Sequence, residues 1–255
     1  MKYEELRPVT SHTGVVLADN PSPMTLDGTN TWVLRASEAP DCIVIDPGED
    51  DDRHLRAVAA HGPVALVLLT HRHHDHAGGA RRFQELTGAP VRALDPSLVL
   101  GSEALADGDV VTAAGVELRV VATPGHTSDS LSFLLTADDA VLTGDTVLGR
   151  GTTVIAHPDG ALGPYLESLR RLADLAPGTA VLTGHGPELP DIAATAAAYL
   201  AHREERLDQV RAALARLGPQ ASPRAVVEDV YADVDRALWP AAELSVRAQL
   251  EYLRS

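Results

Sequence analysis

The chain has 255 residues, of which 45% are hydrophobic and only 4% aromatic, and it carries a formal net charge of −15. Its length allows one large domain or a domain with a smaller appendage, and its composition predicts a core of Val, Leu, Ile and Ala, as in layered α/β proteins. The negative charge argues against a broad basic surface for duplex DNA.

Cysteine content and hydropathy indicate in which cellular compartment the protein is expected. Cys42 is the only cysteine, so an intramolecular disulfide is excluded and a reducing compartment fits. The first residues lack the apolar segment of a signal peptide, and no apolar run approaches the roughly 20 residues that span a bilayer. We therefore expect a cytoplasmic protein that has no membrane partner.

Apolar runs bounded by Gly, Pro, Asn and Asp predict strands, and apolar residues at helical spacing predict helices. The first half is expected to contain strands at 13–18, 31–35, 42–46 and 63–69, and helices at 51–61 and 80–86. The second is expected to contain strands at 91–94, 110–113, 116–122, 130–136, 140–142 and 180–183, and a helix at 162–175. Both halves are strand-rich and carry helices, which suggests two packed sheets with helices outside.

The pattern becomes entirely helical after Pro187. A long helix is predicted at 191–217, ended by Gly218 and Pro219, and shorter helices at 222–230 and at about 237–253. We therefore expect a main, catalytic domain over residues 1–190 and a small, winged-helix-like helical domain over residues 191–255.

The densest group of potential metal ligands follows the strand at 63–69. It comprises His71, His73, His74, Asp75 and His76, which no single helix or strand could pack together in a core. Histidine nitrogens and a carboxylate oxygen are a mixture that suits zinc or a comparable divalent ion. A loop can turn His71 and His73 to one side and Asp75 and His76 to another, which would begin two metal sites. A solvated histidine-rich loop without a function is the alternative.

Three single residues occupy matching positions later in the chain. His126 lies in a turn between two predicted strands, while Asp145 and His185 come directly after strands. Each is next to a glycine, which lets the backbone approach a crowded centre. These positions are where the remaining ligands of a metal site would be expected.

An H-x-H-x-D-H loop followed by single His, Asp and His residues resembles the metallo-β-lactamase superfamily, over about residues 10 to 190. The resemblance implies an αβ/βα four-layer sandwich with two metal ions at one edge. It assigns the ligands in three groups: His71, His73 and His126 to one metal, Asp75, His76 and His185 to the other, and Asp145 between them. It further implies that Asp46 supports a ligand histidine. His74 occupies a variable position and is assigned no role.

The implied activity is hydrolysis by a dinuclear zinc enzyme. Two divalent ions about 3.5 to 4 Å apart can activate water and stabilise charge on an attacked phosphoryl or carbonyl centre. The resemblance suggests that Asp75 both binds a metal and orients the nucleophile. A mononuclear iron dioxygenase and a noncatalytic metal-binding module remain as alternatives, and the complete ligand set favours the hydrolase.

Three further segments resemble the β-lactamase-like-2 group, which includes a mitochondrial single-strand endoribonuclease. They are residues 20–31, 148–153 and 202–206. The resemblance narrowly favours a phosphodiesterase that acts on single-stranded RNA. Glyoxalase II-like hydrolases of glutathione thioesters share the metal motif and a helical tail, but they hold glutathione with a basic cluster that includes lysine, which this tail lacks. Hydrolysis of a small thioester or ester is the alternative.

Four residues are candidates for substrate contacts. Thr152 and Thr153 lie where a substrate could be contacted, and Asn30 is either a substrate-side polar residue or a turn residue. His157 could protonate a leaving group as a general acid. The alternative for His157 is an exposed loop histidine before Pro158.

Overall fold

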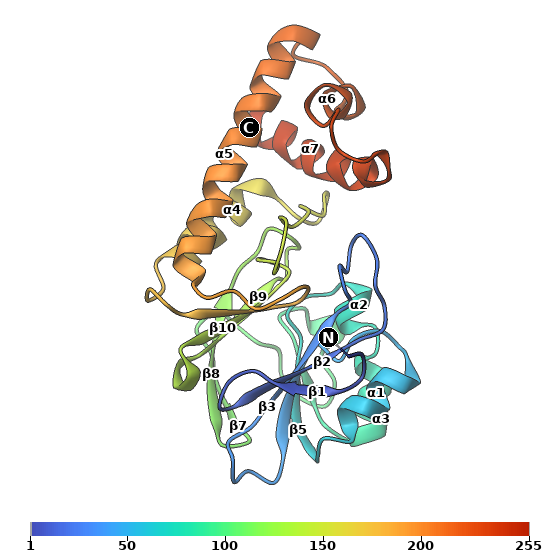
Figure 1. Cartoon of the computed structure of the whole chain (residues 1–255), viewed down its shortest axis with the longest axis vertical. Coiled ribbons are helices and arrows are strands. Elements are labelled where there is room, and N and C mark those ends of the chain that lie inside the picture. Colours follow the sequence, from blue (N-terminus) through green and yellow to red (C-terminus); the bar gives the residue numbers. More distant parts are fainter. Residues whose placement is uncertain (1, 255) are drawn as a thin grey trace.

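The computed structural model describes residues 2–254, which form two β-sheets that pack face to face (Figure 1). The first sheet has the order β1-β2-β3-β4-β5-β6. Neighbouring strands are antiparallel from β1 to β4 and parallel from β4 to β6. Its strands are β1 (Leu6–Pro8), β2 (Thr13–Leu17), β3 (Asn30–Leu34), β4 (Cys42–Ile45), β5 (Val64–Leu68) and β6 (Val91–Arg92).

The second sheet has the order β11-β10-β9-β8-β7. Its pairs are antiparallel except for β10 and β11, which run parallel. Its strands are β7 (Val110–Ala113), β8 (Val116–Ala122), β9 (Leu131–Leu135), β10 (Ala140–Gly144) and β11 (Ala180–Thr183).

The main core lies between the sheets, where residues such as Ile45 of β4 and Phe133 of β9 are completely buried. Helices cover both outer faces. Helices α1 (Asp52–Ala59) and α3 (Ala80–Thr87) cover the first sheet, whereas α4 (Leu162–Ala173) and the first half of α5 (Ile192–Leu217) cover the second. The αβ/βα four-layer sandwich expected from the sequence is thereby confirmed.

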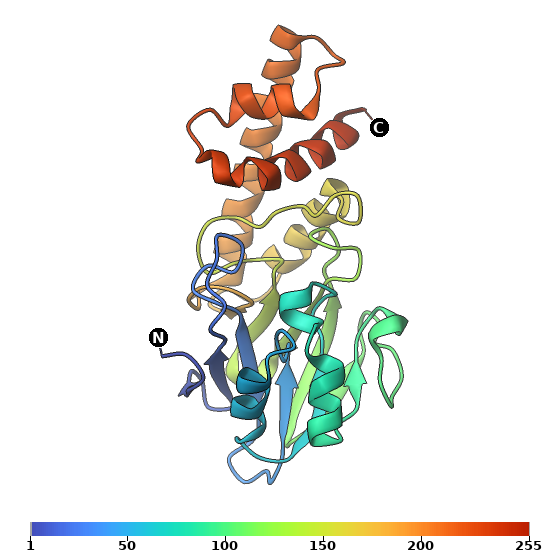
Figure 2. The same cartoon turned by 90° about the vertical axis from the view of Figure 1, so that its right-hand side faces the viewer.

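The C-terminal part is a small helical unit with its own core. Helix α5 has 26 residues and runs on beyond the sandwich, where α6 (Pro223–Val230) and α7 (Trp239–Arg254) pack against its second half (Figures 1 and 2). Val210, Val227 and Trp239 are buried among these three helices. Because α5 belongs to both cores, the predicted domain boundary at residue 190 stays a prediction.

The structure adds short elements that the sequence pattern did not predict. Besides β1, they are a single helical turn inside the histidine loop and three 3-10 turns: α2 (His74–Ala77), η1 (Pro96–Leu98), η2 (Thr136–Asp138) and η3 (Arg236–Leu238). Elements of three or four residues are too short for a periodic pattern. Among residues 2–254, no helix combines the length and the hydropathy needed to cross a bilayer.

Candidate metal centre

The seven predicted ligands lie together at one edge of the two sheets. The loop after β5 carries the histidine cluster, and the loops after β8, β10 and β11 carry the three single residues. The seven side chains form two groups, with His71, His73, His126 and Asp145 in the first and Asp75, His76 and His185 in the second. The resemblance likewise placed His71, His73 and His126 together and Asp75, His76 and His185 together, with Asp145 between the two sets.

Three histidines of the first group meet around His73. Its Nδ1 lies 3.0 Å from Nε2 of His71 and 2.9 Å from Nε2 of His126. Oδ2 of Asp145 lies 3.7 Å from Nε2 of His126. Three ring nitrogens and one carboxylate oxygen therefore face a common point.

The second group is built in the same way. Nε2 of His185 lies 3.2 Å from Nε2 of His76 and 3.1 Å from Oδ2 of Asp75. Oδ1 of Asp145 lies 3.4 Å from Nε2 of both histidines. Since Oδ2 of Asp145 faces the first group, its carboxylate stands between the two groups with one oxygen toward each.

Asp46 and Thr70 fix two of the ligand rings. The carboxylate of Asp46 accepts hydrogen bonds from the Thr70 amide (2.8 Å), from Oγ1 of Thr70 (2.6 Å) and from Nδ1 of His76 (2.8 Å). Because the Thr70 hydroxyl proton goes to Asp46, its oxygen accepts from Nδ1 of His71 at 3.0 Å. Nε2 of both histidines then faces the centre, and that of the neutral His71 ring has a free lone pair.

Backbone carbonyls fix the rings of His126 and His185. Nδ1 of His126 lies 2.6 Å from the Val154 carbonyl oxygen, and Nδ1 of His185 lies 3.2 Å from that of Gly28. Each carbonyl can only accept, so each Nδ1 carries a proton and each Nε2 is the nitrogen that faces the metal site.

These residues fit a pair of divalent cations. Nε2 of His71 and Nε2 of His126 both lie about 3 Å from Nδ1 of His73, which has at most one proton to donate, whereas a cation at this point would accept all three nitrogens as ligands. Oδ1 of Asp145 is completely buried and has no hydrogen-bond partner among residues 2–254; its charged neighbours are the rings of His76 and His185, whose Nε2 atoms each lie 3.4 Å away. An anionic oxygen buried in this way is costly unless it is paired or binds a metal.

The charges of the two groups differ. Burial lowers the pKa of His71 well below its usual value and that of His126 to about 4, so both rings are neutral at pH 7. Burial also acts against charge on His76 and His185, but the carboxylates, above all Asp145, outweigh it; the pKa of His76 is raised well above its usual value and that of His185 to about 9. Metal binding at the second group must therefore release protons.

Gly184, which precedes His185, is held against the centre. A Cβ atom at this position would lie 2.6 Å from Oδ1 of Asp145 and 2.8 Å from Cε1 of His76. Any side chain here would displace one of these two ligands, so the close approach requires glycine.

Arg72 anchors the loop between two ligands. Its guanidinium forms ion pairs with Asp129 at 3.2 Å, with Asp159 at 3.3 Å and with Asp95 at 3.4 Å. The side chain of Asp129 is 4% exposed, so this pair is shielded from water. These contacts tie the turn that carries His71 and His73 to loops from both sheets.

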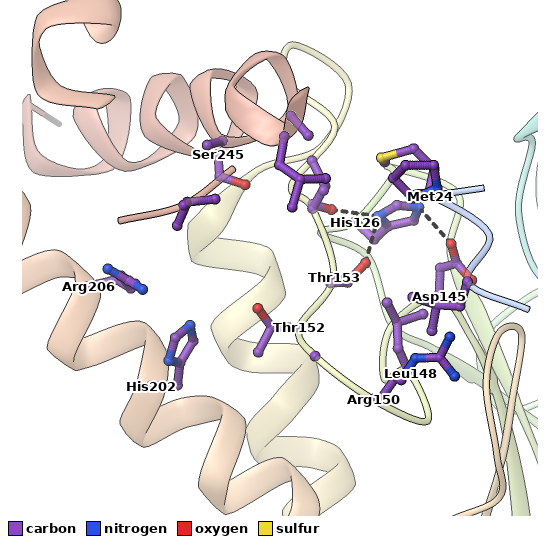
Figure 3. Close-up of a pocket in the computed structure, with 18 of the residues that line it drawn as sticks. Met24, His126, Asp145, Leu148, Arg150, Thr152, Thr153, His202, Arg206 and Ser245 are labelled. Carbon is purple, nitrogen blue, oxygen red and sulfur yellow. Dashed lines mark hydrogen bonds and ion pairs between the residues drawn. The ribbon is translucent and has the colours of Figure 1, made fainter. Parts of the chain in front are cut away.

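A cavity of about 380 Å³ opens beside the first metal group (Figure 3). His126 and Asp145 line it at one side, and residues of α5, α7 and the segment 231–242 line it at the other. The loop 148–154 and residues 23–26 close the remaining walls. The C-terminal helices thus form part of the space next to the metal ligands.

Comparison with known proteins agrees with this geometry. Residues 24–185 match the Metallo-beta-lactamase superfamily, and residues 222–255 match the Beta-lactamase associated winged helix domain. The chain belongs to the metallo-β-lactamase superfamily. The resemblance inferred from the sequence and the helical domain expected at its end are confirmed.

Relatives within the metallo-β-lactamase superfamily cover most of the chain. It is 31% identical to a Beta-lactamase-like protein 2 homolog of Drosophila melanogaster, over 96% of this chain and 88% of that protein. It is 36% identical to an Atrochrysone carboxyl ACP thioesterase of Aspergillus fumigatus, over 78% of this chain and 64% of that protein. The crystal structure of a beta-lactamase domain protein from Burkholderia ambifaria shares the fold, with a TM-score of 0.80, 23% identity and coverage of 98% of this chain and 88% of that one.

Among the predicted substrate residues, only the two threonines line the cavity. Thr152 is exposed, and Oγ1 of Thr153 lies 3.1 Å from Nδ1 of His126. Asn30 is buried, and its amide nitrogen donates to the carbonyl oxygens of Thr183 (3.0 Å) and Gly186 (2.9 Å). In this place Asn30 holds the loop that carries His185.

His157 lies outside this cavity. Its Nε2 is 3.0 Å from Oε2 of Glu251 in α7, and both residues line a separate surface hollow. The structure therefore places the predicted proton donor in a contact between the loop before α4 and the C-terminal helix.

Sequence reasoning missed four residues at the site. Thr70 sets the ring of His71, and His202, Arg203 and Arg206 line the cavity from α5. The segment 202–206 was recognised as a shared motif without a role. The signal was present, because residues three and four apart share one side of a predicted helix.

Proposed function

We propose that the protein is a metal-dependent hydrolase of small acyl thioesters, with two zinc ions as cofactors. The cavity carries this proposal. It reaches His126 and Asp145, and apolar side chains such as Leu148, Val234 and Leu238 line its walls. A mostly apolar wall next to a polar reacting centre suits an acyl chain whose carbonyl lies at the metal ligands.

The chain's own residues bind the cofactor and orient the attacking water. The seven ligands would hold the two ions, which when bound would polarise the carbonyl and activate the attacking water. Burial acts to raise the pKa of Asp75, but His76 and His185 outweigh it and lower the pKa, so the carboxyl is ionised at neutral pH. As a carboxylate, Asp75 can accept a hydrogen bond from the attacking water and orient it.

The position of His157 supports a thioester over a phosphodiester. A thiol has a pKa of about 8.5, so a thiolate can leave without a proton donor. The alcohol leaving group of RNA is a far weaker acid and benefits from a general acid. His157, the residue predicted for that role, is engaged with Glu251 outside the cavity.

Cleavage of single-stranded RNA is the second candidate. The presence of His202, Arg203 and Arg206 in the cavity wall favours RNA as the substrate. Basic side chains bind the phosphates of a nucleic acid. The Aspergillus fumigatus relative that bears the name thioesterase favours the first candidate.

The two reactions can be separated by one set of assays. The zinc-loaded protein would be given a hexanoyl thioester of N-acetylcysteamine, with thiol release measured, and an unstructured single-stranded RNA, with fragments measured. We expect thioester turnover, and we expect Asp75→Asn to lower kcat by about 10² to 10⁴ because the carboxylate that would bind a metal and orient the attacking water is lost.

The Asp75→Asn protein also controls for contaminating enzymes, since a contaminant would survive the substitution. RNA cleavage alone, lost in Asp75→Asn, would overturn the first candidate in favour of the second. No Asp75-dependent turnover of either substrate would overturn both.

A further inference from the structure

One wall of the cavity beside the metal centre is basic. His202, Arg203 and Arg206 all line it, and their spacing places them on the same side of α5. Figure 3 shows His202 and Arg206 across the cavity from His126 and Asp145. This local positive charge contrasts with the net charge of −15 of the whole chain.

Arg203 is a buried charge without a counter-ion. The residue is 4% exposed, and its Nε has no hydrogen-bond partner within residues 2–254. Nη2 donates to the Thr153 carbonyl oxygen at 2.5 Å, and the guanidinium lies 5.1 Å from the centre of the Tyr165 ring. These neighbours offer an acceptor and a ring face, but among residues 2–254 no carboxylate forms an ion pair with Arg203. Buried charges are normally paired, so a partner from outside the chain is indicated.

Arg206, like Arg203, has no counter-ion among residues 2–254. It is half-buried, its guanidinium lies 4.7 Å from the centre of the Tyr231 ring, and Nη1 donates to Oε1 of Gln209 at 2.7 Å. Within the described part of the chain it forms no ion pair. By contrast, Arg211 of the same helix pairs with Asp208 at 2.7 Å.

His202 adds a neutral donor to the two charges. Burial, followed by the charges of Arg203 and Arg206, lowers the pKa of its ring. At pH 7 the ring is therefore neutral, with one N–H to donate. The positive charge of the wall comes from the two arginines.

We propose that His202, Arg203 and Arg206 form an anion subsite that binds a negatively charged group of the substrate, across the cavity from the bond that is hydrolysed. The subsite rests on the proposed thioester hydrolysis and narrows its substrate class. The anionic group is either a carboxylate at the far end of the acyl chain or a phosphate on the thiol part. A guanidinium pair binds both through charge-assisted hydrogen bonds.

Equilibrium binding of thioethers tests the subsite, because thioethers cannot be hydrolysed. The first matched pair is S-hexyl- and S-(5-carboxypentyl)-N-acetylcysteamine, and the second is S-methylpantetheine with and without its 4′-phosphate. We expect the charged member of at least one pair to bind the zinc-loaded protein about 10- to 100-fold more tightly, as for a hydrogen bond to a charged group. If the first pair shows the preference, the anion lies on the acyl chain. If the second pair shows it, the anion lies on the thiol part.

Arg206→Gln is the test variant, because Arg203 also holds Thr153 and its replacement could disturb the loop beside His126. We expect Arg206→Gln to remove most of the preference for the charged member while leaving binding of the neutral member within about threefold. Arg211→Gln is the matched control, since it removes the same charge from the same helix at an exposed ion pair, and it should keep the preference. Equal binding within both pairs, or a preference that survives Arg206→Gln, would overturn the subsite.

Hydrolysis of the corresponding thioesters is measured separately. Discrimination between the thioethers without turnover would leave the subsite standing and overturn the proposed reaction. Turnover of the thioesters without discrimination between the thioethers would leave the proposed reaction standing and overturn the subsite.

Discussion

Asp46 joins three elements through one carboxylate. It follows β4, lies at a φ of 53°, and accepts hydrogen bonds from Thr70 at the end of β5 and from His76 in α2. This left-handed conformation is uncommon for a non-glycine residue but is tolerated by aspartate. The backbone conformation thus directs both carboxylate oxygens of Asp46 toward Thr70 and His76.

Asp46→Asn should weaken metal binding. An asparagine presents an NH₂ group where Thr70 and His76 both need an acceptor, so the His76 ring loses its orientation. Loss of such a supporting partner typically costs 10- to 100-fold in metal affinity, and we expect a loss of about this size in chelator competition. Asp50→Asn, an exposed change in the same loop, should leave the affinity unchanged. Equal affinities for the two variants would contradict this role.

Asp145→Asn should have a larger effect, because Oδ1 and Oδ2 face different metal groups. We expect mass spectrometry to find fewer than two metal ions per chain. We also expect turnover to fall by more than about 100-fold, which is a larger loss than replacing a residue that only supports a ligand would cause. Two bound ions together with normal turnover would show that Asp145 does not bridge the groups.

At the scale of elements, the turn after β8 is held tightly against α4. Gly125 has a φ of 141°, and a Cβ atom there would lie 2.3 Å from Cα of Tyr165. Since that atom belongs to the backbone of a buried helix, the turn that carries His126 would have to move.

Gly125→Ala should therefore lower the free energy of unfolding by about 3 kcal/mol or more, at the upper end of single-residue effects. Gly178→Ala is the control, because Gly178 has a φ of 83° but nothing lies within 4 Å of the added Cβ. It should cost only the backbone strain, about 1 to 2 kcal/mol. Urea denaturation measures both, and similar losses would argue against the clash.

A second contact between elements lies at η2. The carboxylate of Asp138 accepts hydrogen bonds from Oγ1 of Thr10 and, at 3.1 Å, from the His12 amide. Nδ1 of His12 also lies 2.5 Å from Oδ1 of Asp138. Burial acts to raise the pKa of Asp138, but the hydrogen bonds from Thr10 and from the side chain and amide of His12 outweigh it and lower the pKa below its usual 3.8. A lowered native pKa stabilises the fold above the unfolded pKa, and this contribution is lost as the pH falls through the native value.

Asp138→Asn should accordingly lower the free energy of unfolding by about 1 to 3 kcal/mol at pH 7. The difference from the natural protein should persist down to about pH 4 and shrink as the medium becomes more acidic, because the natural carboxyl then also loses its charge. Urea titrations over this range give the measurement. A difference that does not change with pH would assign the effect to packing.

The sequence predicted the longer elements because their burial pattern is regular. In β8, buried and exposed residues alternate from Val116 to Val120, and β4 is apolar throughout because both of its faces are covered. The helical turn α2 (His74–Ala77) was missed because it has only four residues, and two of them, Asp75 and His76, are candidate metal ligands in place of an apolar face. At this turn the residues suit the candidate metal site and do not follow the apolar pattern of a helix.

At the scale of the whole molecule, the metal centre connects the two sheets. The candidate ligands come from loops of both sheets, so bound ions would act as cross-links that only the folded chain can form. Binding at 1,000 times Kd would add about 4 kcal/mol of stability.

Removal of the metals with a chelator should therefore lower Tm by roughly 8 to 16 °C, taking 2 to 4 °C for each kcal/mol in a chain of this size. Calorimetry before and after chelation, followed by zinc addition, measures the change and its reversal. A Tm that does not respond to chelation would contradict cross-linking by metal.

The clustering of the candidate ligands could be predicted from the sequence, whereas the cavity could not. His71 and its neighbours form a local motif, and each later ligand lies next to a glycine at the end of a strand or in a turn. The cavity walls come from residues 23–26, 148–154, 202–206 and 231–245, and only the fold brings these segments together. His157 shows the same limit, since its partner Glu251 is 94 positions away.

Helix α5 also acts as a lever arm. Its 26 residues span about 39 Å, and its first half is clamped to α4 while α6 and α7 pack on its second half. A tilt of about 5° where the clamped half ends would displace the far end, about 20 Å away, by about 2 Å. We therefore expect substitutions at the buried Ala196, in the clamped half, to change the width of the cavity while the candidate metal ligands stay in place.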